Sequence, residues 1–203
     1  MPIEDVAATL EELRLAGKIR YIGFSEVTGD ELKRAAAICP VSAIQMEYSL
    51  QSREIEVKVI PTARELGVGI VAYSPLGRGV LSRTFAGKAD LKEGDWRAAL
   101  PRIADDAAAA ANFAAAERLE VLATSLNLAP ATLALGWVLA QGNDVFPIPG
   151  SKVVARLEQN VAAAHVHLTA DVIKQIEEAV PIAVGARYPT ANAASTFEAR
   201  EKL

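Results

Sequence analysis

One unit recurs along this chain: the end of a helix, a glycine, a short apolar strand, and polar residues directly after the strand. It occurs at residues 15–25 (LAGKIRYIGFS), 65–74 (ELGVGIVAYS) and 140–151 (AQGNDVFPIPGS). Residues 43–49 (AIQMEYS) are similar, with Pro40 in place of the glycine. Strands that alternate with helices are typical of parallel βαβ units. The unit therefore predicts an α/β fold with a parallel sheet of roughly four strands.

A serine lies at the carboxyl end of each predicted strand: Ser25, Ser49, Ser74 and Ser151. In parallel α/β folds these strand ends carry the binding or catalytic site. Several separate strand ends with polar side chains therefore predict one site at that edge of the sheet. The alternative is that serine is simply common where strands end, and these positions alone leave that alternative open.

The segments between the strands carry helix signals. Thr28 with Glu31 three residues later is a capping-box signature, Pro130 suits a first helical turn, and Thr169 is a good N-cap. Residues 75–101 are instead rich in glycine, charge and helix breakers, and we expect a long loop over the ligand-binding face. The predicted helices cover residues 2–16, 28–39, 54–66, 105–125, 130–142 and 169–180.

Composition excludes several classes of protein. The chain has 203 residues, 51% of them hydrophobic and 23% charged, which is enough for a sizeable core in one domain or a large part of one. A net charge of −4 without a basic block argues against nucleic-acid binding. The single cysteine, Cys39, excludes an internal disulfide and fits a reducing compartment. With neither a signal pattern nor an apolar run long enough for a bilayer, we expect a cytoplasmic protein that does not bind a membrane.

Residues 144–160 (DVFPIPGSKVVARLEQN) bring a hydroxyl, two cations and the start of a helix together. Helix N-termini favour anions, and Arg156, four residues after Lys152, could face the same anion. Gln159 and Asn160, one turn further on, could hydrogen-bond a flat heteroaromatic ring. The segment suits a phosphorylated nucleotide, although a capped surface helix with solvated cations is an equally simple interpretation.

The strand ends also carry longer motifs, and these resemble the second half of an aldo-keto reductase, closest to the broad-specificity bacterial and plant branch. The motifs are GKIRYIGFSEV, IQMEYSLQSRE, GVGIVAYSPLGRGVL and PIPGSKVVARLEQNV, with GARYP near the tail. The resemblance runs from Pro2 to about Pro189. It implies a (β/α)8 TIM-type barrel that reduces aldehydes and ketones with NADPH and no metal. Residues 1–203 would form its C-terminal part, a half barrel with the fifth to eighth strands.

The resemblance also implies roles at the nicotinamide. Ser25 and Gln45 would hydrogen-bond the carboxamide, and Tyr73 would stack on the ring and fix the face that delivers hydride. Glu26 is a departure, since many members of the family have asparagine beside the serine. Its carboxylate makes the carboxamide contact less certain.

Further implied roles concern the phosphates and the adenine of NADP(H). Residues lining the pyrophosphate would be Ser74, Leu76, Gly77 and Gly79, with Arg78 as an additional cation. Ser151, Lys152 and Arg156 would hold the 2′-phosphate, which favours NADP(H) over NAD(H), and Gln159 and Asn160 would contact adenine.

The family's catalytic Asp, Tyr, Lys and His lie in the first half of the barrel, and the resemblance assigns no residue of this chain to those roles. The pair His165 and His167 makes a poor metal site without a third ligand. We therefore expect little or no reductase activity from these residues alone. Three hypotheses follow: a truncated form or fragment of an NADPH-dependent reductase, a non-catalytic nucleotide-binding or regulatory half barrel, or a decayed gene product that folds poorly.

A half barrel would leave its outer strands, residues 19–25 and 145–148, with exposed edges and a partly bare inner face. This predicts self-association or pairing with a missing N-terminal half. The substrate of the complete enzyme would be a small carbonyl compound. Phe85 and Trp96 could wall its pocket or could equally pack the loop onto the barrel, and Trp137 is expected in the core.

Overall fold

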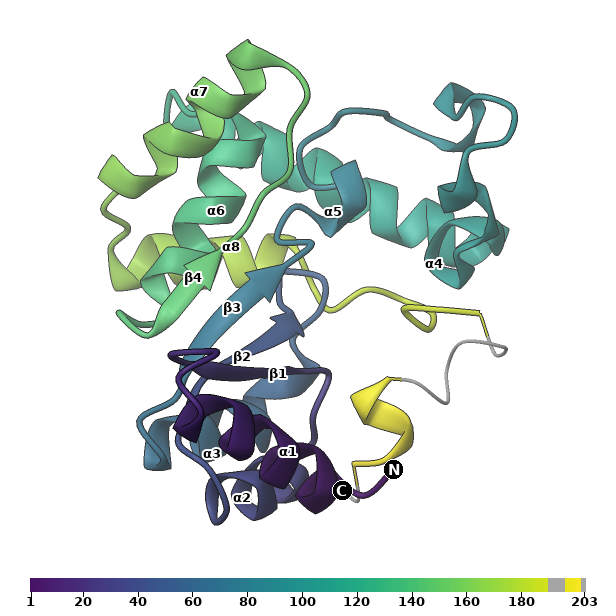
Figure 1. The fold of residues 1–203 in the computed structure, drawn as a ribbon. Helices are drawn as coiled ribbons and strands as arrows, with labels where there is room; N and C mark the ends of the chain where they lie inside the picture. The colour runs from purple at the N-terminus through teal and green to yellow at the C-terminus, as the bar shows by residue number, and fades with distance from the viewer. Residues whose placement is uncertain (190–195, 202–203) are drawn as a thin grey trace.

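A computed structural model describes residues 1–189 and 196–201. Its strands form one parallel sheet in the order β1-β2-β3-β4 (Figure 1). Their bounds are β1 (Ile22–Ser25), β2 (Val41–Glu47), β3 (Gly69–Tyr73) and β4 (Val145–Pro147). The predicted parallel α/β organisation is confirmed, although β1 begins later than the apolar run suggests, because its ladder with β2 starts only at Ile22.

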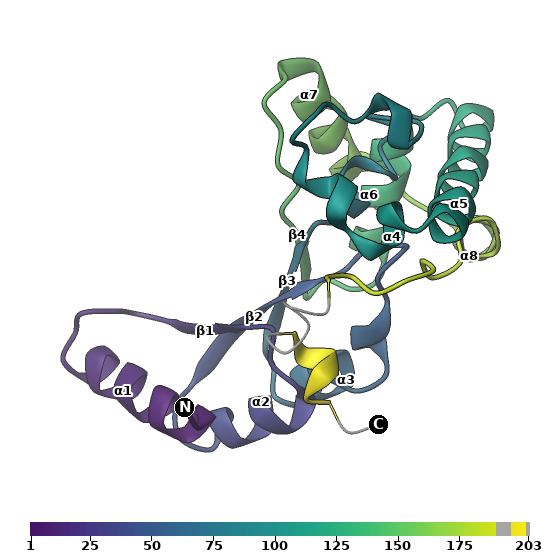
Figure 2. The same cartoon turned by 90° about the vertical axis from the view of Figure 1, so that its right-hand side faces the viewer.

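Helices alternate with the strands, from α1–α3 near β1 and β2 to α5–α8 near β4 (Figures 1 and 2). They are α1 (Ile3–Leu15), α2 (Gly29–Ala36), α3 (Val59–Glu65), α4 (Pro101–Ala104), α5 (Asp106–Ser125), α6 (Pro130–Ala140), α7 (Val154–Ala162) and α8 (Ala170–Ala179). Short 3-10 turns cover Glu54–Glu56, Gly77–Gly79, Lys88–Asp90, Trp96–Ala99, Ala163–His165 and Phe197–Ala199.

The predicted caps are present. Thr28 and Glu31 form both hydrogen bonds of the capping box at the start of α2. Thr169 caps α8, and α5 has a cap that was not predicted, Asp105, whose side chain accepts from the Ala108 N–H. The helix predicted over 54–66 is interrupted, because Lys58 has non-helical dihedral angles and separates a 3-10 turn from α3. Residues 75–101 are mostly irregular, with three 3-10 turns among them.

One face of the sheet and the surrounding helices build the core. Ile44 of β2 and Ile70 of β3 are fully buried, as is Trp137 of α6, which confirms its predicted place. The Trp137 indole N–H donates to the Glu177 carboxylate at 3.1 Å, so its polar atom is satisfied. Cys39 is buried in a smaller apolar cluster, and burial raises the pKa of its thiol.

The other face of the sheet is largely exposed along one row of residues in the described part of the chain. Strand pairing aligns Ser25, Gln45, Val71 and Phe146 in one row across all four strands. Phe146 is 55% exposed, and Ser25 and Gln45, farther along the same row, are also exposed. Of the four strands, β1 and β4 are the outer ones. In the described residues, this row and the outer edges of β1 and β4 therefore leave part of the sheet uncovered.

Among the described residues, no single helix is both long enough and apolar enough to span a membrane. The consecutive helices α5 and α6 satisfy that test only as a pair, and they meet at a bend of 93°. Most of α6 is buried inside the protein, including Leu133, Leu135 and Trp137.

Candidate functional site

A cleft of about 1100 Å³ lies between the loop that follows β3 and the segment that joins β4 to α7. Most of the residues predicted to bind a nucleotide line it: Tyr73, Ser74, Leu76, Arg78, Gly79, Ser151, Lys152, Arg156, Gln159 and Asn160. We call the part formed by residues 151–160 the α7 end, and the part formed around Tyr73 the Tyr73 end. The sheet thus brings together two segments that lie about seventy residues apart in sequence.

The α7 end holds cations that are available to a ligand. Three other cations of the cleft already pair with carboxylates, namely Arg78 with Glu47 (2.8 Å), Arg83 with Glu120 (2.8 Å) and Arg97 with Asp95 (2.6 Å). Lys152 and Arg156 are exposed, and neither has an ion-pair partner within residues 1–189 and 196–201. An anion in the cleft would therefore meet two uncompensated positive charges.

The start of α7 differs from the prediction in register. Val154 is its first residue, so Lys152 precedes the helix, and the expectation of a helical i, i+4 pair with Arg156 is wrong. The two cations share the cleft instead of a helix face. Val153 occupies the N-cap position and offers no side-chain acceptor to the first N–H groups of the helix. Ser151 forms a local turn, in which its hydroxyl donates to the Val153 carbonyl at 3.0 Å and accepts from the Val153 N–H at 3.1 Å.

The loop after β3 turns sharply at left-handed residues. Ser74 has a φ of 49° and Arg78 a φ of 58°, values that are uncommon outside glycine and that concentrate at functional sites. At Gly79, with a φ of 102°, a Cβ atom would lie 3.1 Å from the Arg97 guanidinium. Gly77 is an exception to the prediction, since it lines a separate cavity of about 30 Å³ beside Gln51 and not the cleft.

Arg78 does not present a free charge to the cleft. Its guanidinium pairs with the buried Glu47 carboxylate, donates to the Arg187 carbonyl at 2.9 Å, and lies 4.4 Å from the centre of the Tyr188 ring. Trp96 covers it from the loop side at 5.6 Å. These contacts count against the predicted role of Arg78 as an additional cation at a pyrophosphate.

Ser25 and Gln45 do not line the cleft. They are neighbours on the open face of the sheet, where the Ser25 hydroxyl donates to the Gln45 carbonyl at 3.2 Å. Tyr73 lies on the same face, because its register partner Glu47 is two residues beyond Gln45. The predicted carboxamide contacts of Ser25 and Gln45 stay predictions.

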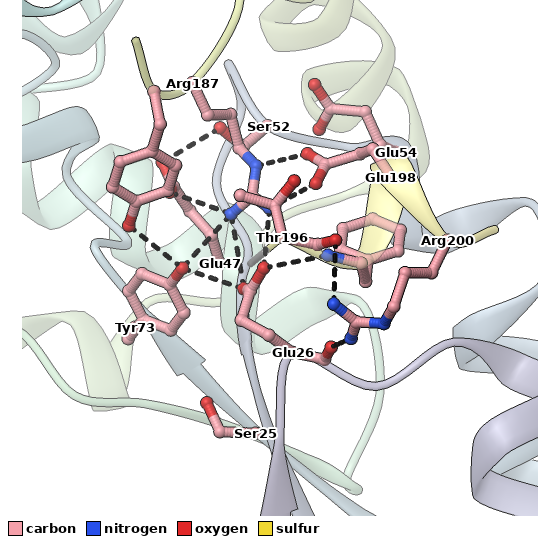
Figure 3. Close-up of polar contacts among 12 residues, drawn as sticks. Ser25, Glu26, Glu47, Ser52, Glu54, Tyr73, Arg187, Thr196, Glu198 and Arg200 are labelled. Atoms are coloured by element: carbon pink, nitrogen blue, oxygen red, sulfur yellow. Dashed lines mark hydrogen bonds and ion pairs between the residues drawn. The ribbon is translucent and has the colours of Figure 1, made fainter. Parts of the chain in front are cut away.

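The Tyr73 end is organised by an arginine that the sequence predictions missed (Figure 3). Arg187 contacts the ends of three adjacent strands, donating to Glu26 after β1 (2.7 Å), to Glu47 of β2 (3.1 Å) and to the Tyr73 hydroxyl of β3 (3.1 Å). Its remaining donors bind the Glu198 carboxylate. The only signal in the sequence was the GARYP motif, which marked the family resemblance without suggesting a role for its arginine.

Burial and charge set the protonation of this network. The pKa of Tyr73 is raised, first by burial and then by its hydrogen bonds and the nearby carboxylates, so the phenol stays protonated and donates to Glu26 at 2.8 Å. Burial alone would lower the pKa of Arg187, but its hydrogen bonds with Glu198 and Glu26 raise it. Glu26 has a φ of 53°, and its carboxylate points to Arg187 and Tyr73. The departure noted in the sequence therefore serves an ion pair.

Comparison with known proteins decides the family. The model of the aldo/keto reductase family matches residues 1–181. The chain belongs to the aldo/keto reductase family. It is 43% identical over 201 residues to the aldo-keto reductase yakc [NADP(+)] of Schizosaccharomyces pombe, covering 97% of this chain and 59% of that protein. It is 44% identical over 194 residues to the probable aldo-keto reductase 1 of Glycine max, covering 93% of this chain and 54% of that protein.

Solved structures share the fold of this aldo/keto reductase chain. The glycerol dehydrogenase AKR11B4 from Gluconobacter oxydans superposes with a TM-score of 0.81 at 24% identity, over 94% of this chain and 57% of that one. The thermostable aldo-keto reductase Tm1743, solved with epalrestat, gives 0.67 at 24% identity, over 88% and 55%. The chain thus shares the parallel α/β fold of these structures over the part that it covers, and it spans a little over half the length of these relatives.

The structure also places the remaining candidate residues of this aldo/keto reductase. Phe85 is buried and packs edge-on against Phe113, so it holds the loop in place, whereas Trp96 is 61% exposed and lines the cleft. Within the described residues no three His, Cys, Asp or Glu side chains are grouped as metal ligands, and this applies to His165 and His167 as well.

Proposed function

We propose that this chain forms the cofactor-binding part of an NADP(H)-dependent aldo-keto reductase that reduces aldehydes and ketones to alcohols. The observation that carries the proposal is the pair of unpaired cations, Lys152 and Arg156, beside the uncapped start of α7. A 2′-phosphate carries close to two negative charges, and cations together with free helix N–H groups are its natural ligands. The name of the yakc relative, which includes NADP(+), supports this choice.

The residues of the cleft fit the other parts of the cofactor. Gln159 and Asn160 would contact adenine, the turn from Ser74 to Gly79 would pass the pyrophosphate, and Tyr73 would lie against the nicotinamide ring. When bound, NADPH supplies the hydride. Ser25 and Gln45, on the same face of the sheet as Tyr73, would orient the carboxamide.

We infer that the chain is the C-terminal half of the barrel and has little reductase activity by itself. Its tyrosine hydroxyls near the core are engaged, since Tyr48 donates to Glu56 at 2.8 Å and Tyr73 to Glu26. Without a general acid for the carbonyl oxygen, a rate loss of about 10²–10⁴-fold is expected. The bare face around Phe146 would pair with the missing N-terminal strands or with a second copy. A small carbonyl substrate and a cytoplasmic location complete the proposal.

Titration of the purified chain with NADPH and with NADH, followed by the fluorescence of Trp96 and Trp137, tests the proposal. Saturable binding that prefers NADPH is expected. Replacing Lys152 and Arg156 by alanine should weaken NADPH binding by at least about tenfold and NADH binding much less, because only NADPH has the 2′-phosphate. The double alanine variant of Lys33 and Arg34 on α2 removes the same charge outside the cleft and is the control.

Equal losses for both cofactors would contradict the assigned 2′-phosphate site. Binding of NADPH together with no carbonyl reduction, even after an N-terminal half is supplied, would favour the alternative of a non-catalytic nucleotide-binding half barrel.

A further inference from the structure

We propose that Arg187 is a positioning residue for the Tyr73 end of the cleft: through the Tyr73 hydroxyl it fixes the ring against which a nicotinamide would lie. The inference deepens the proposed function and rests on it. Arg187 does not line the cleft, so any effect that it has on a ligand passes through a neighbour.

The Tyr73 side chain joins the cleft to the network. Tyr73 is the last residue of β3, and it lines the cleft. Its hydroxyl donates to Glu26 at 2.8 Å, accepts from Arg187 at 3.1 Å, and lies 3.3 Å from the Tyr188 hydroxyl. A tyrosine side chain has two torsions, and a hydroxyl held by a donor and an acceptor fixes both. The orientation of the Tyr73 ring is therefore set by Glu26 and Arg187, which hold its hydroxyl.

Arg187 is itself held rigidly. It is only 4% exposed, and its planar guanidinium binds Glu26, Glu47 and Glu198 (Figure 3). Glu47 is fixed in turn by Arg78 at 2.8 Å and by the Ser52 hydroxyl at 3.2 Å. One guanidinium from the tail therefore aligns the ends of β1, β2 and β3, which a flexible lysine with a point charge could not do.

The contacts of Arg187 are more than is needed to hold the segment around Phe197 against the rest of the protein. Phe197 of the tail is 3% exposed, so apolar packing already anchors the segment. Buried ion pairs often add little net stability compared with apolar groups of similar size. The feature that stability leaves unexplained is the bond from Arg187 to a hydroxyl whose ring faces the cleft. Positioning of that ring accounts for it.

Two ligands separate this role from a general effect on folding. NADPH would contact both ends of the cleft, whereas adenosine 2′,5′-bisphosphate lacks the nicotinamide and would contact only the α7 end. We expect Arg187→Lys to weaken NADPH binding by about tenfold. Its affinity for adenosine 2′,5′-bisphosphate should stay within about twofold of that of the unmodified chain. Arg64→Lys is the matched control, because Arg64 pairs with Asp144 at 2.8 Å at the other end of the sheet and should change neither affinity.

The variant Tyr73→Phe keeps the ring and removes only the hydroxyl, so it tests the route. In the Tyr73→Phe background, Arg187→Lys should cause no further loss of NADPH affinity, since the two changes break the same link. Thermal melting of each variant, followed by circular dichroism, shows that the protein measured is folded.

Several outcomes would overturn the inference. If Arg187→Lys lost equal affinity for NADPH and for adenosine 2′,5′-bisphosphate, the role of Arg187 would be in folding alone. Fully additive losses in the double variant would show that it does not act through Tyr73. Failure of the unmodified chain to bind even adenosine 2′,5′-bisphosphate would overturn the proposed function and the inference together. Normal NADPH binding by Arg187→Lys would overturn the inference alone.

Discussion

At the α7 end of the cleft, Lys152 and Arg156 are exposed and have no ion-pair partner in residues 1–189 and 196–201. At the Tyr73 end, Arg187 is buried and binds three carboxylates and a phenol. Both ends carry arginine, but the first leaves its charge for a ligand and the second neutralises its charge within the protein. The comparison teaches that charge alone does not mark a ligand-binding residue, and that the partners of each cation do.

The largest expected difference between the two ends is in stability. Arg187→Met would leave the carboxylates of Glu26 and Glu198 in a partly buried site without their main cation, at an expected cost of about 3–5 kcal/mol in the free energy of unfolding. Lys152→Met removes an exposed and unpaired charge and should change that free energy by less than about 0.5 kcal/mol. Urea unfolding of both variants measures the difference. If both variants lost less than about 0.5 kcal/mol in the free energy of unfolding, the ion pairs of Arg187 would not stabilise the Tyr73 end.

A second difference concerns the backbone between the two ends. Gly79→Ala introduces a side chain at a φ of 102°, with the Arg97 guanidinium 3.1 Å from the new Cβ, and should cost about 1–3 kcal/mol of stability. Gly87, in the same loop, has extended backbone and open space around its Cα, so Gly87→Ala is the control and should be nearly neutral. Thermal unfolding compares them. Equal melting temperatures would indicate that the loop relaxes freely around Gly79.

Much of this architecture could be predicted from the sequence, and the limits have physical causes. The four strands, the caps at Thr28 and Thr169 and the core position of Trp137 depend on local signals or strong hydrophobic patterns. The role of Arg187 was missed because its partners Glu26 and Glu47 lie more than a hundred residues away. Pairing of this kind follows from the fold and leaves no periodic pattern in the chain.

The same limit explains why the surroundings of two predicted site residues differ from those expected. The residue types at Arg78 and Lys152 are equally suited to a phosphate, and only the fold shows that Glu47 neutralises the first. The start of α7 was predicted too early because Lys152 and Arg156 have a helical spacing of four residues, whereas the Ser151 hydroxyl closes a turn that precedes the helix. A spacing of four residues is compatible with a helix but does not show that the helix begins before the first of them.

The dependence of NADPH affinity on salt should differ between the two ends of the cleft. Exposed cations are screened, so NADPH affinity should fall by about three- to tenfold when ionic strength rises from about 50 mM to about 500 mM. Replacing Lys152 and Arg156 by alanine should remove most of this dependence, whereas Arg187→Lys should lower affinity and keep the slope. Titrations at several salt concentrations test both expectations. An unchanged slope in the first variant would mean that other cations attract the ligand.

The smallest expected effect concerns acid. Hydrogen bonds with Arg187 hold the pKa of Glu198 below its ordinary value of 4.5, against the opposing effect of burial. A carboxylate with a depressed pKa in the folded state stabilises that state above the unfolded pKa, and the contribution is lost as pH falls through the folded value. Glu198→Gln should therefore be less stable than the unmodified protein at neutral pH, with a difference that shrinks below about pH 4.5. Urea unfolding between neutral pH and about pH 3 measures it, and Glu158→Gln on the exposed surface of α7 provides the control. A difference that stayed constant with pH would mean that the Glu198 charge contributes nothing to holding Arg187, and that the tail is fixed by its apolar contacts.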